Sequence, residues 1–306
     1  MTRPAELADV CLAISSFHND SAVIELIARV TSDGDHPFGS ILVVDSLGSG
    51  AMPEAIRTRG WPRVDYVCFD ENLGSAGNLA KRLELAAKTP CRFVYAVNHD
   101  GSVDVDVIHK LREVGATDAR IAAAYPLRRM TGSGGAYDIT GVLPVPVRSL
   151  RVKKPPRSRT LDVYWSSSNG ALYSLEPSRR GLLPWADLWM GWEDLGYGWL
   201  LRQRGYRQLL VCTARSDDAY EYRRLSSGTW LSDKPSWYSY YYARNLLLAA
   251  RRSHGPLLLQ ATVLGRVLSE FAVIAALRSE KRARLGFLSA GLRDALRGRS
   301  GKWRLP

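Results

Sequence analysis

Residues Val64–Lys88 read VDYVCFDENLGSAGNLAKRLELAAK, and this stretch contains the unit from which the fold can be predicted. Val64–Phe69 is a mostly apolar run and predicts a buried strand. Polar and small residues follow from Asp70 to Asn78, and we expect a helix over Leu79–Lys88. A strand, a glycine-containing turn and a helix in this order are typical of proteins with a parallel α/β sheet.

The same unit recurs along the first hundred residues. Each further apolar run ends in polar residues, and these runs are Val10–Ile14, Ile41–Asp45 and Phe93–Val97. We therefore predict an α/β protein whose mainly parallel central sheet is flanked by helices. Ligands of such sheets bind beyond the carboxyl ends of the strands. Asp45, Asn72 and Asp100 are expected at that edge.

Residues Met190–Tyr206 predict a helix with an acidic start. Apolar side chains recur at helical spacing from Trp192 to Trp199. Glu193 and Asp194 lie in the first turn, where the helix dipole favours an ionised carboxylate. Such a carboxylate suits a general base that takes a proton from a hydroxyl group. Taken alone, the pair is better explained as the acidic first turn that most helices have.

Two of the strand ends suggest a site for a diphosphate. Asp100 follows a buried strand, and Mg²⁺ typically takes one or two protein carboxylates together with phosphate oxygens. An ordinary Asn/Asp turn explains Asn98–Asp100 equally well. The small residues Gly74–Asn78 permit close approach of a diphosphate, although they match neither the dinucleotide-binding nor the P-loop glycine pattern. Asp104 and Asp106 are interpreted as caps of the next helix, Val107–Val114.

The charge of the chain indicates an anionic partner. The chain has 306 residues, a net charge of +12 and a pI near 9.7, which suggests nucleic acid, anionic lipid or phosphorylated substrates. The four cysteines form no C-x-x-C pair, so we expect buried free thiols and a cytoplasmic protein rather than a zinc site or disulfides. Residues 1–9 show no apolar signal-peptide core.

The second half of the chain is less regular. Gly132–Arg159 is rich in glycine, proline and basic residues and is predicted to be a long loop. Tyr164–Ser174 returns to strand character, with small polar residues that could line a pocket, among them Asn169 and Gly170. Gly255–Leu277 is apolar, but Gln260, Arg266 and Glu270 interrupt it, which argues against a membrane-spanning helix. Arg278–Arg304 resembles a basic amphipathic surface for anionic lipid, and a solvated helical tail is the alternative.

In this order, the segments of residues 10–248 resemble a family 2 glycosyltransferase of the GT-A fold, with inversion of configuration. The likeness is greatest to the bacterial rhamnosyl- and galactofuranosyltransferase-like branch. Ala13–Asn19 resembles the first strand and base-binding loop of the family, and Val43–Ser46 its nucleoside-binding segment. Asn72–Asn78 resembles its Asn-x-Gly turn, and Asn98–Asp100 takes the place of its Asp-x-Asp metal motif. Trp192–Asp194 resembles its acceptor motif, and Tyr241–Asn245 a Tyr-x-x-Arg-Asn element.

The resemblance implies a GT-A domain over residues 1–248 and a basic helical extension over residues 249–306. It implies that Asp194 is the base, with Glu193 beside it, and that Asp100 binds Mg²⁺ or Mn²⁺. Asp217 or Asp218 would replace a histidine that the family often uses for the metal. The implied nucleotide-sugar ligands are Ser15, Phe17, Asn19, Asp45, Asn72, Gly74, Gly77, Asn78, Asn98 and His99. The implied acceptor pocket contains Trp192, Asn169 and Gly170.

The reaction implied is transfer of a sugar from a nucleotide diphospho-sugar, UDP- or dTDP-linked, in bacterial glycan or glycoconjugate synthesis. The acceptor would be a glycan, a lipid-linked glycan or a small molecule. The basic C-terminus would bring the protein to the inner face of the cell membrane, and a homodimer is left open. Nucleic acid is not expected, because aromatic and basic residues do not alternate as in single-strand binders.

Two alternatives remain at this stage. A sugar nucleotidyltransferase would share the fold, but Ser15–Asp20 lacks the glycine-rich basic loop that such enzymes usually have after the first strand. A non-catalytic, basic membrane-binding protein on a decayed transferase scaffold would explain why Asn98 stands where the family has an acid. A test of donor hydrolysis separates these hypotheses.

Overall fold

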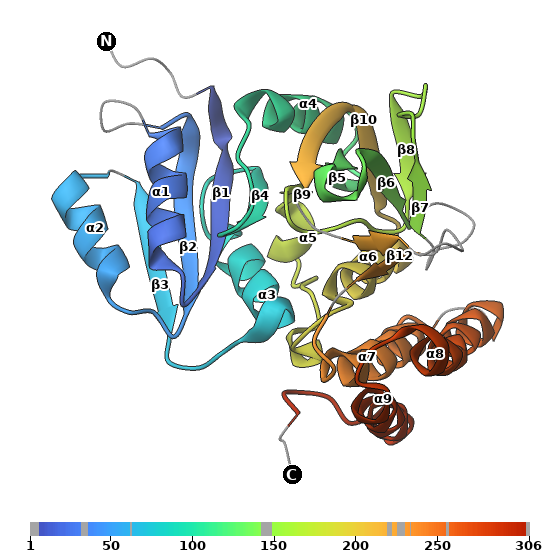
Figure 1. Cartoon of the computed structure of the whole chain (residues 1–306). Coiled ribbons are helices and arrows are strands. Elements are labelled where there is room, and N and C mark those ends of the chain that lie inside the picture. Colours follow the sequence, from blue (N-terminus) through green and yellow to red (C-terminus); the bar gives the residue numbers. More distant parts are fainter. Residues whose placement is uncertain are drawn as a thin grey trace.

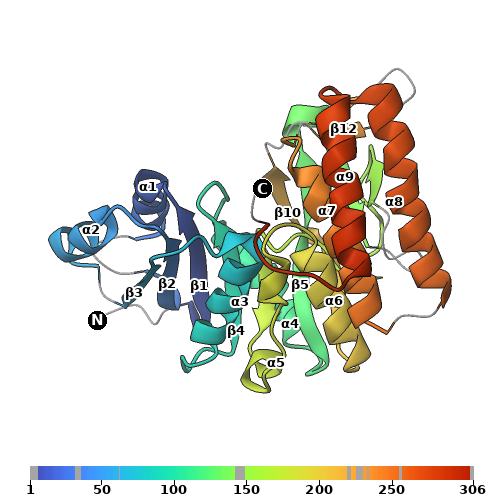
Figure 2. The ribbon, with the colours of Figure 1, turned by 90° about the horizontal axis from the view of Figure 1, so that it is seen from below.

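The structure is a computed structural model of the chain. It describes residues 6–31, 36–61, 63–141, 149–218, 222–224, 230–232, 234–254 and 257–303. Helices lie on both faces of one central sheet. A group of three further helices, formed by the C-terminal part of the chain, lies beside it (Figures 1 and 2).

The sheet is mixed and mostly parallel. Its main path runs β3 (Val64–Phe69), β2 (Phe38–Ser46), β1 (Leu7–Phe17), β4 (Phe93–Asn98), β9 (Ala171–Ser174), β5 (Ile121–Met130), β10 (Arg207–Asp218) and β8 (Thr160–Val163). β3, β2, β1 and β4 are mutually parallel, whereas β9 pairs antiparallel with both β4 and β5. The predicted α/β fold class is therefore confirmed.

Helices cover both faces of this sheet, which explains why its strands are continuous apolar runs. α1 (Asp20–Val30), α2 (Ala51–Arg59) and α4 (Val105–Gly115) contribute to the core on one face, together with Leu12 and Ile14 of β1. α3 (Gly74–Ala86) and α6 (Glu193–Gln203) contribute to the core on the other face, together with Cys11 and Ala13. Alternate residues of one strand thus enter two different cores.

Several local predictions need correction. The helix expected from Leu79 begins at Gly74, because the small residues that precede Leu79 belong to its first turn. The long loop expected over Gly132–Arg159 contains β6 (Ala136–Thr140) and β7 (Ser149–Val152), which pair with each other and, through β6, with β5. The thiol of Cys68 is exposed, while the other three cysteines are buried. Asp104 caps α4 as predicted, accepting from the backbone N–H groups of Asp106 and Val107.

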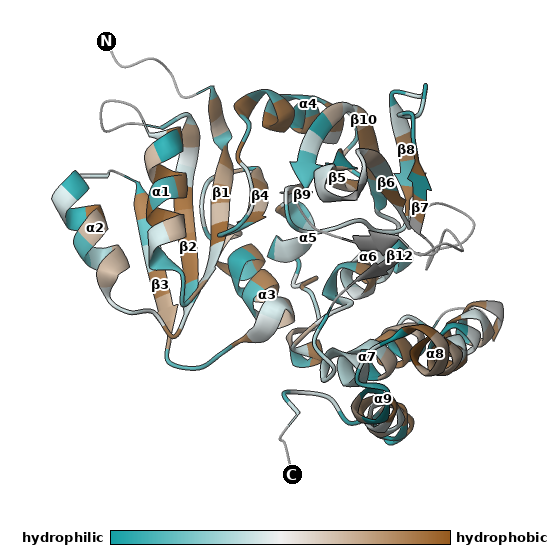
Figure 3. Ribbon diagram, viewed as in Figure 1, coloured by the Kyte–Doolittle hydropathy of each residue, from teal (hydrophilic) through white to brown (hydrophobic). Residues whose placement is uncertain are grey.

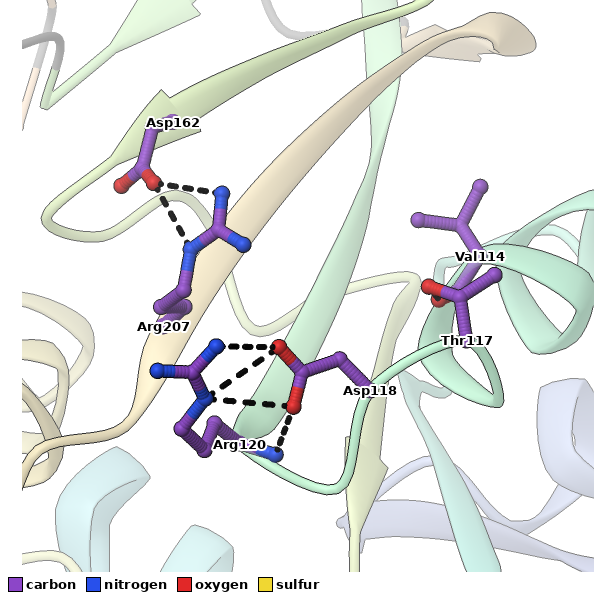
Figure 4. A network of polar contacts seen from close by, with 6 residues as sticks. All are labelled: Val114, Thr117, Asp118, Arg120, Asp162 and Arg207. Atoms are coloured by element: carbon purple, nitrogen blue, oxygen red, sulfur yellow. Dashed lines mark hydrogen bonds and ion pairs between the residues drawn. The ribbon is translucent and has the colours of Figure 1, made fainter.

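Ion pairs lie at the amino ends of β5 and β10, near the β8 edge of the sheet (Figure 4). Asp162 on β8 accepts two hydrogen bonds from Arg207 at the start of β10, 3.1 and 3.0 Å long. Arg120, just before β5, pairs with Asp118. These contacts lie at the end of the sheet opposite the carboxyl ends of β5 and β10, and we assign them a structural role only.

The C-terminal helices pack on one another and on α6. They are α7 (Tyr238–Arg252), α8 (Leu257–Leu277) and α9 (Lys281–Leu296). Buried side chains from all three form one cluster with Trp165, Leu195 and Trp199. The domain boundary that the sequence predicted after residue 248 falls inside α7. The short strands β11 (Tyr222–Arg224) and β12 (Trp230–Ser232), the short helix α5 (Glu176–Arg179) and the turn η2 (Ala186–Leu188) complete the described elements.

Candidate active site

A cavity of about 260 Å³ lies at the carboxyl ends of β1, β2 and β4. The amino ends of α3 and α6 also reach it, which brings two helix dipoles to one place. The residues that line it are Ser15, Ser16, Phe17, Ser46, Asn72, Gly74, Ser75, Asn78, Arg82, Asn98, His99, Asp100, Ser168, Met190 and Glu193. Residues from six separate parts of the chain therefore meet here.

Many of the predicted ligands lie in this lining. The cavity brings together Ser15, Phe17, Asn72, Gly74, Asn78, Asn98, His99, Asp100 and Glu193. Asn19, Asp45, Gly77, Asn169, Gly170, Trp192, Asp194, Asp217 and Asp218 are not among its lining residues, and the contacts that they make instead are described below.

The junction of β1 and β4 is fixed by hydrogen bonds between side chains. The hydroxyl of Ser15 donates to Oδ1 of Asn98 over 3.0 Å. The backbone N–H of Asn98 donates to Oδ1 of Asn169, also over 3.0 Å, and Gly170 N–H donates to the carbonyl of Ala96. Asn169 and Gly170 thus support the end of β4 from behind.

Asp45 lies beneath the cavity, at the end of β2. Its side chain is fully buried, and Oδ2 accepts a 3.0 Å hydrogen bond from the hydroxyl of Tyr66. Burial raises the pKa of Asp45. Oδ1 of Asp45 and Oδ1 of Asp20 are buried without a hydrogen-bond partner among the described residues. Unpartnered buried acceptors are uncommon, so they suggest a ligand that donates hydrogen bonds. Asn19 precedes α1 and makes no side-chain cap.

The turn into α3 brings backbone to the edge of the cavity. Oδ1 of Asn72 accepts from the N–H of Gly74, and Asn78 Nδ2 donates to the carbonyl of Val44 on β2. Gly74 has a φ of +65°, and a Cβ at this position would lie 2.1 Å from the carbonyl oxygen of Trp189. Only glycine fits such a close approach. Gly77 faces Leu73 and the η2 turn rather than the cavity.

The segment before the acidic pair has an unusual backbone. Trp189, Gly191 and Trp192 have φ angles of 61°, 77° and 66°. For tryptophan such angles cost roughly 1–2 kcal/mol each, so neighbouring contacts must hold them. Asn245 on α7 supplies these contacts: its Nδ2 lies 2.8, 2.7 and 3.0 Å from the carbonyl oxygens of Leu188, Met190 and Gly191.

Arg244, next to Asn245, supports the same segment. It is 1% exposed and donates to the carbonyl of Leu188 over 2.8 Å. Its guanidinium lies over the rings of Tyr240 and Tyr241. The side chains of the Tyr-x-x-Arg-Asn element thus hold the turn that precedes Glu193. Trp192 packs in the same region, against Trp165, Tyr242 and the guanidinium of Arg266, and not in the cavity.

Glu193 and Asp194 begin α6 and share a buried environment. Burial, and then the charge of Asp194, raise the pKa of Glu193 to about 7, while the Ser75 hydroxyl opposes this shift. Burial also raises the pKa of Asp194, whereas Ser168, Arg128 and Arg82 favour its ionised form. The repulsion between the two carboxylates is mutual, but Arg128 and Arg82 favour the ionised form of Asp194, so we take Asp194 as the member that carries the negative charge. Its Oδ1 has no hydrogen-bond partner among the described residues.

Arg82 is a site residue that sequence reasoning missed. It is 2% exposed, yet it lines the cavity, and its Nη1 donates to the carbonyls of Val97 and Ala13 over 2.9 and 3.3 Å. Burial lowers its pKa to about 10, which leaves it charged at neutral pH, near both carboxylates. One signal was present in the sequence: Arg82 follows Asn78 by four residues and therefore shares its helix face.

The predicted metal ligands are dispersed. Asp100 is exposed at the cavity beside His99. Asp217 pairs with Arg129, and Asp218 pairs with Arg128, both over 2.8 Å, at the ends of β10 and β5. Within the described ranges, no group of three or more His, Cys, Asp or Glu side chains could hold a metal ion.

Comparisons with known proteins identify the fold. No protein-family model matches this sequence, and no curated protein matches it. Solved structures do match. The mannosyltransferase PcManGT from Pyrobaculum calidifontis, in complex with GDP-Man and Mn²⁺, has a TM-score of 0.54 at 14% identity, over 96% of this chain and 89% of the other. Residues 1–349 of S. aureus TarS have a TM-score of 0.54 at 13% identity, over 94% and 80%.

A third match is GalNAc-T7 with UDP, GalNAc and Mn²⁺, with a TM-score of 0.51 at 13% identity. It covers 78% of this chain, which spans only half the length of that protein. All three neighbours are GT-A glycosyltransferases. The chain therefore has the GT-A fold, as the sequence predicted.

Proposed function

We propose that this protein is an inverting glycosyltransferase that moves a sugar from a nucleotide diphospho-sugar to an acceptor hydroxyl. The observation that carries the proposal is that Glu193 lines the strand-end cavity, with Asp194 directly behind it in the first turn of α6. The same cavity contains Asp100, the amino end of α3 and the buried cation Arg82. This combination suits an anionic ligand next to a general base.

The nucleoside is proposed to bind over β1 and β2. Phe17, 41% exposed at the cavity, offers a ring face to a base. The unpartnered oxygens of Asp20 and Asp45 are buried behind the cavity and would accept from the N–H or O–H groups of a nucleoside once the side chains in front of them move aside. Ser15, Asn72 and the amino end of α3 would face the diphosphate. UDP and dTDP are the favoured nucleotides on the basis of the sequence resemblance.

The donor set fits a divalent cation only if the ligand supplies most of the coordination. Asp100 and the neighbouring His99 are the protein donors at the cavity, and Mg²⁺ commonly binds through one carboxylate together with substrate phosphates and water. Mg²⁺ or Mn²⁺ bound there would neutralise charge on the leaving diphosphate. Asp217 and Asp218 remain proposed ligands, and their arginine partners would have to yield for either to take part.

Asp194 is the proposed base. Arg82, Arg128 and Ser168 favour its carboxylate form, which is required to accept a proton. It would take the proton of the acceptor hydroxyl while that oxygen attacks the anomeric carbon. The bond from this carbon to the diphosphate oxygen breaks on the opposite side, and the bonding electrons leave with the diphosphate. Configuration at the anomeric carbon is thereby inverted.

The test combines a substrate panel with matched variants. A panel of UDP-, dTDP- and GDP-sugars is assayed for donor hydrolysis and transfer, with nucleoside diphosphate binding measured by calorimetry. Asp194→Asn should abolish transfer and leave donor binding nearly unchanged, whereas Asp100→Ala should weaken binding only in the presence of Mn²⁺. Glu193→Gln, the same acid-to-amide change at the neighbouring carboxylate, is the control for Asp194→Asn.

Each result has a clear meaning. If Asp194→Asn turns over normally while Glu193→Gln does not, the base assignment is wrong and Glu193 takes the role. If none of these sugar nucleotides binds, the proposed donor class is wrong. Formation of a sugar nucleotide from a sugar phosphate and a nucleoside triphosphate would instead identify a nucleotidyltransferase.

A further inference from the structure

An apolar strip runs along the outward side of α8. We call this strip the outer face of α8, and its exposed residues are Leu257, Ala261, Leu264, Gly265, Leu268, Ala272, Ala275 and Ala276. The exposed polar residues Gln260, Thr262 and Ser269 lie along its margins. Leu257, Leu264 and Leu268 are 84%, 42% and 51% exposed. Figure 2 places α8 at the rim of the molecule, and Figure 3 shows that its ribbon is mostly hydrophobic. A surface helix normally turns polar residues outward, so this helix requires a different explanation.

The two charged residues of α8 point toward the protein. Arg266 Nε donates to the hydroxyl of Tyr242 over 3.1 Å, and Glu270 pairs with Arg278 over 3.4 Å. Val263, Val267 and Ile274 are fully buried on the same side. The charged residues that argued against a membrane helix in the sequence thus contact α7 and the segment after α8. The described part of the outer face carries no charge.

The ends of α8 are flanked by exposed cations. Arg251 lies at the end of α7, which precedes α8, and Lys281 and Arg282 begin α9, which follows it; one exposed carboxylate, Glu280, lies beside Lys281. Twenty-one residues of α-helix span about 32 Å, so an apolar strip of that length has positive charge at both ends. Lipid membranes with anionic headgroups match this pattern, because apolar side chains enter the headgroup–acyl boundary while cations meet the phosphates.

A second copy of the chain fits less well. Two α8 helices packed antiparallel about a two-fold axis would place Arg251 of one copy near Lys281 and Arg282 of the other, and like charges repel. A spanning helix fits less well too, because leaving α7 would expose Arg266 and Glu270 to hydrocarbon. The apolar side of α9 packs inside the protein, where Leu288 is fully buried. α9 therefore presents cations, rather than apolar side chains, to a membrane.

We propose that the outer face of α8 binds the surface of an anionic lipid bilayer, with the flanking cations contacting lipid phosphates. The inner side of α8 contacts Trp192 through Arg266, and Trp192 directly precedes Glu193. Docking would therefore hold the carboxylate pair near the bilayer. This last step rests on the proposed function, and it narrows the acceptor to a hydroxyl of a lipid-linked molecule.

The docking itself is tested without any sugar substrate. The full chain is floated with vesicles of phosphatidylcholine alone, and with vesicles in which about a third of the lipid is phosphatidylglycerol. We expect binding to the anionic vesicles that weakens with added salt. Leu268→Glu should lower the partition constant at least about tenfold, because it removes a leucine that docking would bury in the bilayer and adds a charge that anionic lipid repels. Lys281→Ala should lower it about fivefold.

The control is Ala51→Glu at the exposed start of α2, which adds the same charge on a remote helix and should bind nearly as the original chain does. Thermal unfolding of Leu268→Glu should be unchanged, because the side chain is exposed. Three results would overturn the proposal: equal binding by Leu268→Glu, a dimer in sedimentation that this substitution converts to monomer, or retention in membranes after alkaline carbonate, which indicates a spanning helix. An inactive protein that still binds anionic vesicles would refute only the proposed function.

Discussion

Replacing Asn245 by alanine tests whether α7 positions the acidic pair. Nδ2 of Asn245 contacts the carbonyl oxygens of Leu188, Met190 and Gly191. An amide nitrogen carries two hydrogens, so at most two of these contacts are full hydrogen bonds. The carbonyl of Leu188 keeps its bond to Arg244 in the variant. The carbonyls of Met190 and Gly191 lose their donor.

The expected cost follows from these two carbonyls. Each buried acceptor left without a partner costs about 1–3 kcal/mol, so Asn245→Ala should lower the free energy of unfolding by about 2–6 kcal/mol. Most domains have more stability than this, so the variant should remain folded at 25 °C. The freed turn no longer has to keep the positive φ angles of Trp189 and Trp192. Glu193 and Asp194 come next in the chain and would move with this turn. A displacement of about 1 Å can lower a rate about a hundredfold.

The measurement compares unfolding with turnover in two variants. Leu111→Ala in α4 removes a fully buried side chain far from the turn and should cost a similar 2–5 kcal/mol. Both variants should unfold at lower denaturant concentration, but only Asn245→Ala should lose about a hundredfold in kcat. Equal kcat values for the two variants would show that the Asn245 contacts stabilise the fold without placing the carboxylates.

Three further predictions concern the same site. Burial raises the pKa of Glu193 to about 7, so its protonated form contributes to folding stability at pH values below its ordinary pKa, and that stability is lost as the pH rises through 7. Glu193→Gln should therefore raise the unfolding temperature at pH 8 and leave it nearly unchanged at pH 5, which calorimetry can check. Gly74→Ala should destabilise the protein by more than about 2 kcal/mol and weaken binding of nucleoside diphosphate, whereas Gly60→Ala, with a similar φ of +60° and open space around it, should cost only about 1 kcal/mol. Arg82→Leu removes a cation close to both carboxylates, so the rising limb of the pH–rate profile should move to higher pH, and an unshifted profile would exclude this role.

The fold was predictable because the same sequence pattern, an apolar strand followed by polar residues, occurs several times along the chain. Continuous apolar strands, each followed by polar residues, can only be buried on both faces of a parallel sheet, and β1 divides its side chains between two cores in this way. The same topology predicted that residues at strand ends would meet. Ser15 and Asn98, 83 positions apart in the chain, are joined by a hydrogen bond at the cavity.

Other features depended on contacts that a local pattern does not contain. β6 and β7 lie in a glycine- and proline-rich region, and their pairing is fixed by β5, which ended only a few residues earlier. The start of α3 at Gly74 depends on the carbonyl of Trp189, 115 residues away. Arg82 reads as a surface cation of an amphipathic helix until the carbonyls of Ala13 and Val97 are seen to bind it.

The C-terminal helices are physically part of the site that the N-terminal sheet builds. The turn before Glu193 contacts Asn72 and Ser75 on one side, through Trp189 Nε1 and Gly191 N–H, and Arg244 and Asn245 on the other. A backbone with two tryptophans at positive φ persists only when surrounding contacts over-determine it. Arg266 extends the same chain of contacts to α8 through Trp192. Any force that moves α8, such as seating on a bilayer, therefore acts on the residues next to the carboxylate pair.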